Sequence, residues 1–384
     1  MEPDLKDLRY LIVGAGIFGC TIAECIARRK KERVLVIDKR DHIGGNCYSE
    51  ANPETGIEVH KYGTHIFHTA DEEIWQYINR FTEFNSYRHQ VLTTHGEQVF
   101  QMPINLETIN TFYKVNLRPY QVDDFLKKEI AKDAISDPQN FEEMAITMIG
   151  RPLYEAFIKG YTIKQWARDP KDLPASILKR LPFRKNYDES YYFDRWQGIP
   201  LKGYTAIFER MLDNPLIDVA LDTDYFELRD RVPTNCLTLY TGALDRFFDY
   251  DLGRLEYRTL KFEEEVVNVS DYQGTSVMNY ADPAIPFTRI HEPRHLHPER
   301  KYTEESTVII REYPKLDTGD NPYYPVNTTE NNQMVEQYIE RTRDLKNIIF
   351  GGRLADYKYY DMDRAIAKAL ELYETKYDPH VPSA

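Results

Sequence analysis

The stretch YLIVGAGIFG, residues 10–19, runs four apolar residues into the glycine pattern G-x-G-x-x-G. A helical pattern continues from Phe18 to about Arg29. A second apolar run, VLVI at residues 34–37, then stops at Asp38. The order is a strand, a tight glycine turn, a helix and a second strand, which is the context in which this motif binds dinucleotides. We therefore predict an α/β fold that begins with a dinucleotide-binding unit.

Each glycine of the pattern has its own physical role. Gly14 permits the tight turn, Gly16 lets the backbone approach a pyrophosphate, and Gly19 lets the helix pack close to the sheet. The helix N-terminus offers unpaired N–H groups and the positive end of its dipole to the phosphates. Asp38 lies about 20 residues further on, where an acid binds a ribose hydroxyl. An acid there favours a free 2′-hydroxyl group, and so FAD or NAD over NADP.

The segment KRDHIGGN, residues 39–46, narrows the choice of cofactor. It places a glycine pair just beyond the acid, which resembles the R-x-G-G segment of FAD enzymes of the glutathione-reductase type. In those enzymes the segment meets the adenine end and the diphosphate. The resemblance favours FAD, with an ordinary loop as the alternative interpretation.

Length and composition bound the class of protein. The chain has 384 residues, enough for two or three domains, and a net charge of −13, which argues against broad binding to nucleic acid. The longest apolar stretch is too short to span a bilayer, and the N-terminus has no signal region, so we expect a soluble cytoplasmic protein. The four cysteines have neither zinc nor disulfide spacing and are interpreted as buried free thiols.

Three histidines follow closely at His60, His65 and His68. No cysteine or carboxylate cluster lies near them in the sequence, so we predict no metal site. A histidine beside the cofactor and a hydrogen-bonded core histidine remain equal alternatives.

Residues 106–149 have helical spacing, and a second helical piece, residues 153–158, is expected to end at Gly160. A connecting segment with prolines and adjacent cations follows and suggests a mobile loop near residues 167–182. Arg180 in this loop suits a diphosphate because its planar fork donates in pairs. Taken alone, an arginine between prolines is more often a solvated charge. Strands are expected at residues 91–102, 216–221, 237–241, 262–269, 286–292 and 308–313.

Together these pieces resemble the UDP-galactopyranose mutase family over nearly the whole chain, from Gly14 to about Ala367. The strongest stretches are HIGGN at residues 42–46, YGTHIFHT at 62–69, KGYTIKQW at 159–166 and LPASILKRLP at 173–182. The segments at residues 286–290, 322–325 and 352–363 add to the match.

The resemblance implies roles for individual residues. Arg180 and Arg289 are the expected catalytic residues, which hold the substrate diphosphate beside reduced FAD. The expected cofactor-binding residues are Gly14, Gly16, Phe18, Gly19, Asp38, Lys39, Gly45, Asn46, His65, Ile66, Arg353, Tyr360, Asp361 and Met362. The expected substrate-binding residues are Phe157 and Tyr161 around the uracil, Thr162, Trp166, Arg180, Asn279 and Arg289, and Tyr191, Tyr324 and Tyr359 as hydroxyl donors to the diphosphate.

The resemblance also implies the architecture: a Rossmann-type FAD-binding domain with an inserted helical domain and an antiparallel β-sheet domain. The expected boundaries are residues 1–83, 203–245 and 326–384 for the FAD domain, 105–196 for the helical domain, and 84–104, 197–202 and 246–325 for the sheet domain. A homodimer is expected, with NADPH or NADH as the reductant of FAD.

The implied reaction interconverts UDP-galactopyranose and UDP-galactofuranose without net redox change and feeds galactofuranose into cell-surface polysaccharide. Attack by N5 of reduced FAD on the anomeric carbon displaces UDP, and the sugar ring opens and recloses. Glu312 is a candidate proton carrier that ranks below the arginines.

Alternatives remain at the level of substrate and of class. Ala167-Arg168 stands where the family often has glycine, and Arg168 is read as a surface charge or a contact near the sugar. UDP-N-acetylgalactosamine or dTDP-fucose are alternative substrates. A flavin oxidase or dehydrogenase on the same scaffold, or a non-catalytic nucleotide-binding or prenyl-protein-escort module, are the rival functions.

Overall fold

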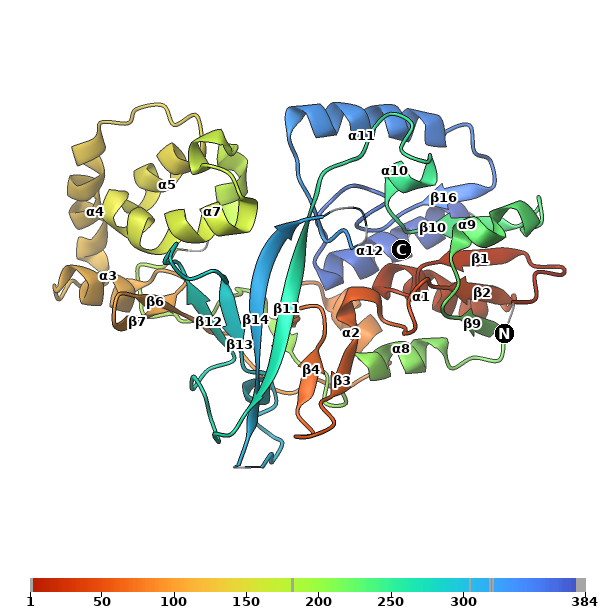
Figure 1. The fold of residues 1–384 in the computed structure, drawn as a ribbon, viewed down its shortest axis with the longest axis horizontal. Coiled ribbons are helices and arrows are strands. Elements are labelled where there is room, and N and C mark those ends of the chain that lie inside the picture. Colours follow the sequence, from red (N-terminus) through yellow and green to blue (C-terminus); the bar gives the residue numbers. More distant parts are fainter. Residues whose placement is uncertain (1–2, 181–182, 304, 318, 320, 378–384) are drawn as a thin grey trace.

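The computed structural model describes residues 3–180, 183–303, 305–317, 319 and 321–377. The chain forms three parts (Figure 1): a parallel sheet with helices on both faces, a twisted and mostly antiparallel sheet, and a group of short helices beyond it. The long strands of the second sheet run between the other two parts. The predicted fold class is confirmed.

The parallel sheet has the strand order β16-β10-β1-β2-β9. Its strands are contributed by three separate stretches of the chain, so the domain is discontinuous. They are β1 (Tyr10–Val13), β2 (Val34–Ile37), β9 (Ile217–Ala220), β10 (Leu237–Tyr240) and β16 (Ile348–Phe350).

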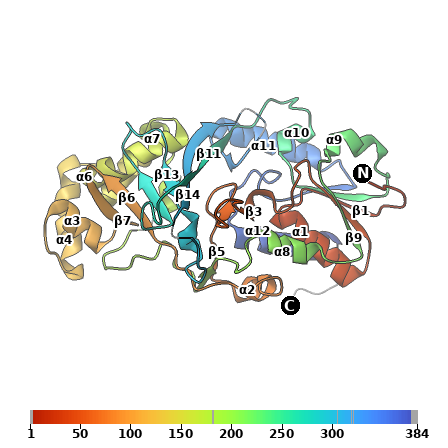
Figure 2. The ribbon, with the colours of Figure 1, turned by 60° about the horizontal axis from the view of Figure 1, so that its bottom comes forward.

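Alternation along β1 and β2 gives this sheet two cores. Ile12 and Val36 face one core, whereas Leu11 and Leu35 face the other, because successive side chains of a strand point to opposite faces. The first core is covered by helices that Figure 2 shows side by side: α1 (Ile17–Cys25), α8 (Thr205–Leu212) and α12 (Met362–Leu372), with α2 (Glu72–Ile78) beyond them. The opposite face carries α9 (Tyr225–Leu228), α10 (Leu244–Phe247) and α11 (Thr329–Thr342).

The helical part has a hydrophobic core of its own, which includes Leu106, Phe141 and Phe157. Its helices begin at clear caps: the side chain of Asn105 accepts from Thr108 N–H, and that of Asn140 accepts from Glu143 N–H. The helices are α3 (Leu106–Tyr113), α4 (Val122–Ile130), α5 (Phe141–Ile149), α6 (Arg151–Leu153) and α7 (Gly160–Trp166).

The expectation that Gly160 ends a helix is wrong. A wide helical turn, η5 (Tyr154–Lys159), leads directly into α7, which begins at Gly160 with helical backbone angles. A Cβ at Gly160 would lie 2.1 Å from the carbonyl oxygen of Ala281. The glycine therefore serves close packing between α7 and the loop after β12, and does not stop the helix.

The second sheet has the order β15-β11-β14-β13-β12-β6-β7. It is antiparallel as predicted, except that β12 pairs with β6 in parallel. These two strands are separated by the whole helical part, so no tight turn forces them to run in opposite directions. The strands are β6 (Val91–His95), β7 (Gln98–Met102), β11 (Tyr257–Val267), β12 (Val277–Tyr280), β13 (Arg289–His291), β14 (Thr307–Leu316) and β15 (Tyr324–Pro325).

Two small pairs complete the architecture. They are β3 (Ser49–Ala51) with β4 (Glu58–His60), and β5 (Phe67–Thr69) with β8 (Trp196–Gly198). The four cysteines are buried free thiols, as predicted. Within the described ranges, none of the helices has both the length and the apolar character needed to cross a bilayer.

The contact between α1 and α2 depends on one buried carboxylate. Glu24 accepts hydrogen bonds from Arg28 Nε at 2.6 Å, Arg80 Nη2 at 2.7 Å and the Tyr77 hydroxyl at 3.2 Å. Burial alone would raise the pKa of Glu24, but the two arginines outweigh it and lower that pKa. The carboxylate is therefore charged and holds both helices.

We expect Glu24→Gln to lower the free energy of unfolding by about 1–3 kcal/mol, because a neutral amide cannot match two guanidinium groups. Glu374→Gln is the control, since the Glu374–Arg29 pair spans 3.6 Å and is partly exposed; it should cost at most about 1 kcal/mol. Urea unfolding of both variants gives the comparison. Equal losses would contradict the role assigned to Glu24.

Candidate functional site

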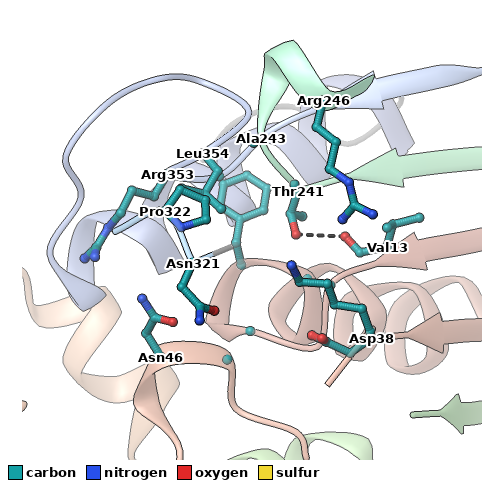
Figure 3. Close-up of a pocket in the computed structure, with 18 of the residues that line it drawn as sticks. Val13, Asp38, Asn46, Thr241, Ala243, Arg246, Asn321, Pro322, Arg353 and Leu354 are labelled. Atoms are coloured by element: carbon teal, nitrogen blue, oxygen red, sulfur yellow. Dashed lines mark hydrogen bonds between the residues drawn. The ribbon is translucent and has the colours of Figure 1, made fainter. Parts of the chain in front are cut away.

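A cavity of about 510 Å³ opens at the carboxyl ends of the parallel strands. Its walls come from the turn after β1, the loop 38–47, the segment after β10 and residues 352–365. Figure 3 shows Val13, Asp38, Thr241 and Arg353 around it, each carried by a different one of these segments. Ligands of open parallel sheets bind at this edge.

The glycines of the first turn have the geometry that the sequence predicted. Gly14 has φ +113°, and a Cβ there would lie 2.0 Å from Thr241 Oγ1. A Cβ at Gly19 would lie 2.0 Å from the carbonyl oxygen of Gly14, so α1 could not approach β1. Gly16 is different, because its Cβ would meet only the Gly45 Cα at 3.9 Å. Its lack of a side chain keeps the cavity floor open.

Asp38 lines the cavity and also fixes the glycine turn. Its Oδ2 accepts from Ala15 N–H at 2.8 Å, and its Oδ1 accepts from Arg40 N–H at 3.0 Å. Each carboxylate oxygen can accept a further hydrogen bond, so a ribose hydroxyl can still be bound.

Most of the predicted cofactor residues line this cavity, and two do not. Ile66 is buried in a small cluster with Ile199 and Leu296. Asp361 is the N-cap residue of α12 and lies beside the lining residues Tyr360 and Met362. The predicted residues that line the cavity are Gly14, Gly16, Phe18, Gly19, Asp38, Lys39, Gly45, Asn46, His65, Arg353, Tyr360 and Met362.

The sequence analysis missed a second group of lining residues. Thr241 donates from Oγ1 to the carbonyl of Val13 at 2.8 Å, and Arg246 pairs with Asp224 at 2.5 Å. Glu256 and Asn321 line the same cavity from more distant parts of the chain. Thr241 follows directly after the apolar run of β10, and this was the only one of these positions that a sequence signal marked.

His65 lines the cavity and is also hydrogen-bonded within the fold. Its Nδ1 lies 2.7 Å from the carbonyl oxygen of Gly63. Loss of hydration, together with the charge of Arg353, lowers the pKa of His65 to about 4. The ring is therefore neutral at neutral pH. Since a carbonyl only accepts, Nδ1 carries the proton and Nε2 is an acceptor.

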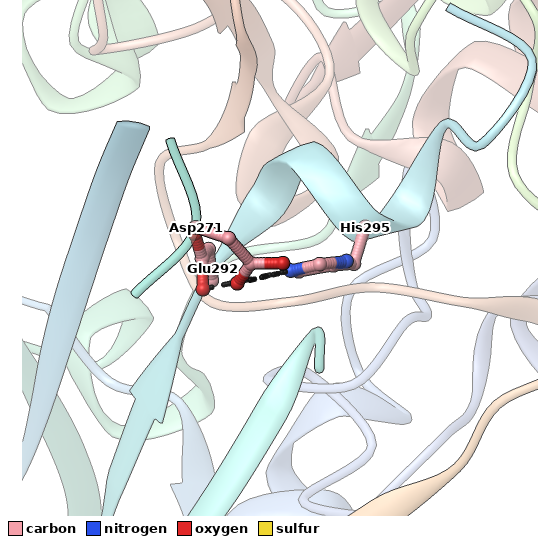
Figure 4. A group of neighbouring side chains, drawn as sticks. All are labelled: Asp271, Glu292 and His295. Atoms are coloured by element: carbon pink, nitrogen blue, oxygen red, sulfur yellow. Dashed lines mark hydrogen bonds and ion pairs between the residues drawn. The ribbon is translucent and has the colours of Figure 1, made fainter. Parts of the chain in front are cut away.

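The other two histidines of this stretch have separate partners. His60 Nδ1 accepts from the backbone N–H of His65 at 3.1 Å, and His68 pairs with Asp194 at 2.5 Å. Among the described residues, the only cluster with metal-ligand geometry is Asp271, Glu292 and His295 (Figure 4). It lines neither this cavity nor a smaller one between the helical part and the second sheet. Glu292 there accepts from the backbone N–H groups of Tyr272 and Gln273, so the cluster is explained by loop packing.

A second cavity, of about 90 Å³, lies between the helical part and the second sheet. Buried polar atoms in its wall, Asn279 Oδ1, Arg289 Nε and the Tyr161 hydroxyl, have no hydrogen-bond partner in the described part of the chain. Buried polar groups are nearly always paired, and a polar ligand in this cavity would supply the missing partners. The predicted substrate residues that line it are Phe157, Tyr161, Thr162, Tyr191, Asn279 and Arg289.

Arg289 forms an ion pair with the buried carboxylate of Glu312. Its Nη1 lies 3.8 Å from Glu312 Oε2, and the same oxygen lies 3.0 Å from His291 Nε2. Thr64 Oγ1 contacts the other ring nitrogen of His291 at 2.8 Å. Burial alone would raise the pKa of Glu312, but Arg289, His291 and Thr288 outweigh it and lower that pKa to about 2. Glu312 therefore stays ionised and holds the guanidinium of Arg289 at the cavity.

A ring of aromatic and cationic side chains connects the two cavities. Tyr324 and Tyr359 stack with ring centroids 5.7 Å apart, and the guanidinium of Arg353 lies 5.0 Å from the centroid of Tyr359. Arg353 lines the larger cavity, and Tyr324 lies close enough to Arg289 to influence its charge. Arginine and tyrosine side chains, which are able to bind phosphate, therefore continue from one cavity towards the other.

The remaining predicted residues differ in their placement. Trp166 packs against the core of the helical part and lines neither cavity. The backbone of Arg180 ends the short helix η7 (Ala175–Arg180), and its side chain lies outside the described part of the structure. Arg168 is partly exposed and lines neither cavity, and its Nη2 makes hydrogen bonds of 3.1 and 2.9 Å to the carboxylate of Glu256, which lines the larger cavity.

Two glycine substitutions separate folding from cofactor binding. Gly16→Ala should leave the apo-protein about as stable as wild type and weaken FAD binding, because its Cβ has room in the fold but narrows the phosphate site. Gly19→Ala should lower the free energy of unfolding by about 1–3 kcal/mol through overpacking. Urea unfolding of the apo-proteins and titration with FAD measure both effects. Wild-type affinity for FAD in Gly16→Ala would contradict the assignment.

Comparisons with known proteins agree with this geometry. A sequence model of the UDP-galactopyranose mutase family matches residues 156–359, and one for an NAD(P)-binding Rossmann-like domain matches residues 12–81. The chain is 43% identical over 369 residues to a probable UDP-galactopyranose mutase of Klebsiella pneumoniae, covering 96% of this chain and 94% of the relative. It is 40% identical over 375 residues to a dTDP-fucopyranose mutase of Escherichia coli, covering 94% and 97%.

Solved structures show the same fold. The crystal structure of a reduced UDP-galactopyranose mutase matches with a TM-score of 0.73 at 13% identity, covering 96% of this chain and 94% of that chain. A putative protoporphyrinogen oxidase from Exiguobacterium matches with a TM-score of 0.63 at 11% identity, covering 97% and 99%. The family match over more than half of the chain, with relatives aligned over nearly all of it, shows that the chain is an enzyme of the UDP-galactopyranose mutase family.

Proposed function

We propose that this enzyme interconverts UDP-galactopyranose and UDP-galactofuranose, with reduced FAD in the larger cavity and the nucleotide in the smaller one. The observation that carries the proposal is the set of unpaired polar atoms around Arg289 and Asn279, joined through Tyr324 and Arg353 to a dinucleotide site.

The residues of the larger cavity fit FAD. The N-cap Gly16 of α1 makes no side-chain cap, so the first N–H groups of that helix can bind a diphosphate. Asp38 suits the adenosine ribose. Neutral His65 and cationic Arg353 also line this cavity and suit the flavin ring. A cation beside the ring favours the anionic form of the reduced flavin.

A reduced flavin bound there supplies a nucleophilic nitrogen for the anomeric carbon of the sugar. The protein contributes binding and charge. Arg289 holds the diphosphate as it leaves, and Arg180 is proposed to join it from η7. The hydroxyl groups of Tyr191, Tyr324 and Tyr359 donate to the same phosphates, while Phe157 and Tyr161 frame the uracil and exclude water.

Glu312 does not serve as the proton carrier in this proposal. A carboxyl group with a pKa of about 2 is ionised at neutral pH and has no proton to give. Its role is to orient the guanidinium of Arg289.

Several finer assignments belong to the proposal. Ile66, Asp361, Thr162 and Trp166 keep the supporting roles expected from the family. The three sets of segments expected from the sequence are proposed as the domains. In support, every strand of the parallel sheet lies in the segments of the FAD domain, and every strand of the second sheet lies in those of the sheet domain. The enzyme is further proposed to be a cytoplasmic homodimer. NADPH or NADH would reduce its FAD, and its product would supply galactofuranose for polysaccharide.

The second candidate substrate is dTDP-fucopyranose, since the dTDP-fucopyranose mutase of Escherichia coli is almost as similar as the Klebsiella relative. UDP-N-acetylgalactosamine is a third. dTDP-fucopyranose differs from UDP-galactopyranose in the base, the ribose and the sugar, whereas UDP-N-acetylgalactosamine differs in the sugar alone. Both leave the proposed diphosphate contacts the same.

The test is to incubate the FAD-loaded protein with UDP-galactofuranose and, separately, with dTDP-fucofuranose, before and after reduction with dithionite. Chromatography should show conversion of UDP-galactofuranose to the pyranose form only with the reduced protein. The kcat/KM for UDP-galactofuranose should be higher than that for dTDP-fucofuranose. Conversion of dTDP-fucofuranose alone would replace the substrate. Oxygen consumption with an organic substrate, and no isomerisation of either sugar, would contradict the mutase proposal.

A further inference from the structure

Lys164 on α7 is bound by four backbone carbonyl groups of one loop. Its Nζ lies 2.6 Å from the oxygen of Tyr280, 3.0 Å from that of Asp282, 3.0 Å from that of Ile285 and 2.9 Å from that of Phe287. These residues belong to the segment 280–288, which joins β12 to β13. Hydrogen bonds from a charged donor are about twice as strong as neutral ones, so this ammonium is a strong link between helix and loop.

A second contact, one helical turn earlier, joins the same two elements. A Cβ on Gly160 would lie 2.1 Å from the carbonyl oxygen of Ala281 and 3.2 Å from the ring of Pro283. Residues 160 and 164 lie on the same face of a helix. The helix α7 is therefore docked on the loop at two points, by close packing at Gly160 and by the ammonium of Lys164.

The two docked elements carry the two sides of the smaller cavity. Helix α7 presents Tyr161 and Thr162, and the strands that flank the loop present Asn279 and Arg289. Asn279 and Arg289 are directly paired across β12 and β13. The loop between these strands thus sets where the phosphate side of the cavity lies relative to the base side.

We propose that Lys164 is a positioning residue, which holds the base-binding residues of α7 at a fixed distance from Asn279 and Arg289 by binding the loop 280–288. Lys164 lines neither cavity, so it acts through these residues and not on the substrate. This inference rests on the proposed function, because it assumes that a nucleotide occupies the smaller cavity.

The four carbonyl groups around Lys164 make its ammonium group hard to replace. Four carbonyl oxygens converge on one point, where a neutral apolar group would leave them without a donor. Burial lowers the pKa of Lys164 to about 8, and Asp282, whose side chain is exposed, opposes that shift. Lys164 is therefore mainly an ammonium at pH 7, and the carbonyls supply its contacts. A free primary ammonium ion of the right length should restore what a truncated lysine loses.

The experiment uses the FAD-loaded, oxidised protein and measures binding of UDP and of dTDP by calorimetry. Lys164→Met keeps the length of the side chain and removes the charge, so the Kd of the preferred nucleotide should rise roughly tenfold or more. FAD content should remain that of wild type. Lys127→Met, on an exposed lysine of α4, is the matched control and should not change the Kd.

Two further measurements separate positioning from a general structural role. Hydrogen exchange of the backbone amides at 281–288 should become faster in Lys164→Met, while exchange in the rest of the protein should stay as in wild type. For Lys164→Ala, added n-propylammonium, which replaces the missing atoms, should restore nucleotide affinity. Tetramethylammonium at the same concentration has charge without N–H donors and should not.

The outcomes distinguish this inference from the proposed function. Wild-type nucleotide affinity in Lys164→Met, or equal effects of the two ammonium ions, would overturn the positioning role. If wild type binds neither nucleotide, the proposed function fails, and unchanged exchange at 281–288 would overturn the docking as well. Should Lys164→Met not fold, Lys164→Gln, which keeps two N–H donors, should fold and show an intermediate loss of affinity; wild-type affinity there would count against the inference.

Discussion

The buried carboxylate of Glu312 is the constraint on which the proposed substrate side depends. It lies on β14, is only 3% exposed, and is kept ionised by Arg289, His291 and Thr288. A buried charge without partners is costly, so moving Arg289, His291 or Thr288 away from Glu312 would cost free energy. Arg289 consequently presents a positive charge to the smaller cavity with a fixed orientation. The same network reaches Thr64 through His291, next to the segment that carries His65 at the larger cavity.

The rest of the molecule forms a cavity on either side of this network. The glycine turn after β1 and the acid after β2 form a dinucleotide site, which opens at the carboxyl edge of the parallel sheet. The long pair β11 and β14 separates that sheet from the helical part and carries Glu312 between them (Figure 1). The helical part then closes the smaller cavity with α7. In the proposed reaction the nucleotide leaves and returns to the same sugar, and binding by the residues around the smaller cavity would keep it in place meanwhile.

Much of the cofactor site could be predicted, because its signals are local. Gly14, Gly19 and Asp38 lie within one β-α-β unit, and each has a role that depends on neighbours in sequence. Thr241, Glu256 and Asn321 were missed because they reach the cavity through sheet pairing between distant segments. Gly160 was misread as a helix end, since a glycine needed for close packing and one that stops a helix look the same without the partner. Lys164 gave no signal for the same reason: its four acceptors are backbone atoms of a loop more than a hundred residues away.

The central claim is that Arg289, supported by Glu312, binds the diphosphate of the nucleotide. The most direct measurement compares the affinity of the FAD-loaded protein for UDP and for uridine, in wild type and in Arg289→Ala. Arg311→Ala is the control, because Arg311 lies on the neighbouring strand β14 and pairs with Glu265 at 2.6 Å. The account predicts that Arg289→Ala loses roughly 30-fold or more of the preference for UDP, about 2 kcal/mol, while uridine binding and FAD content stay unchanged. An unchanged preference for UDP in Arg289→Ala would contradict it.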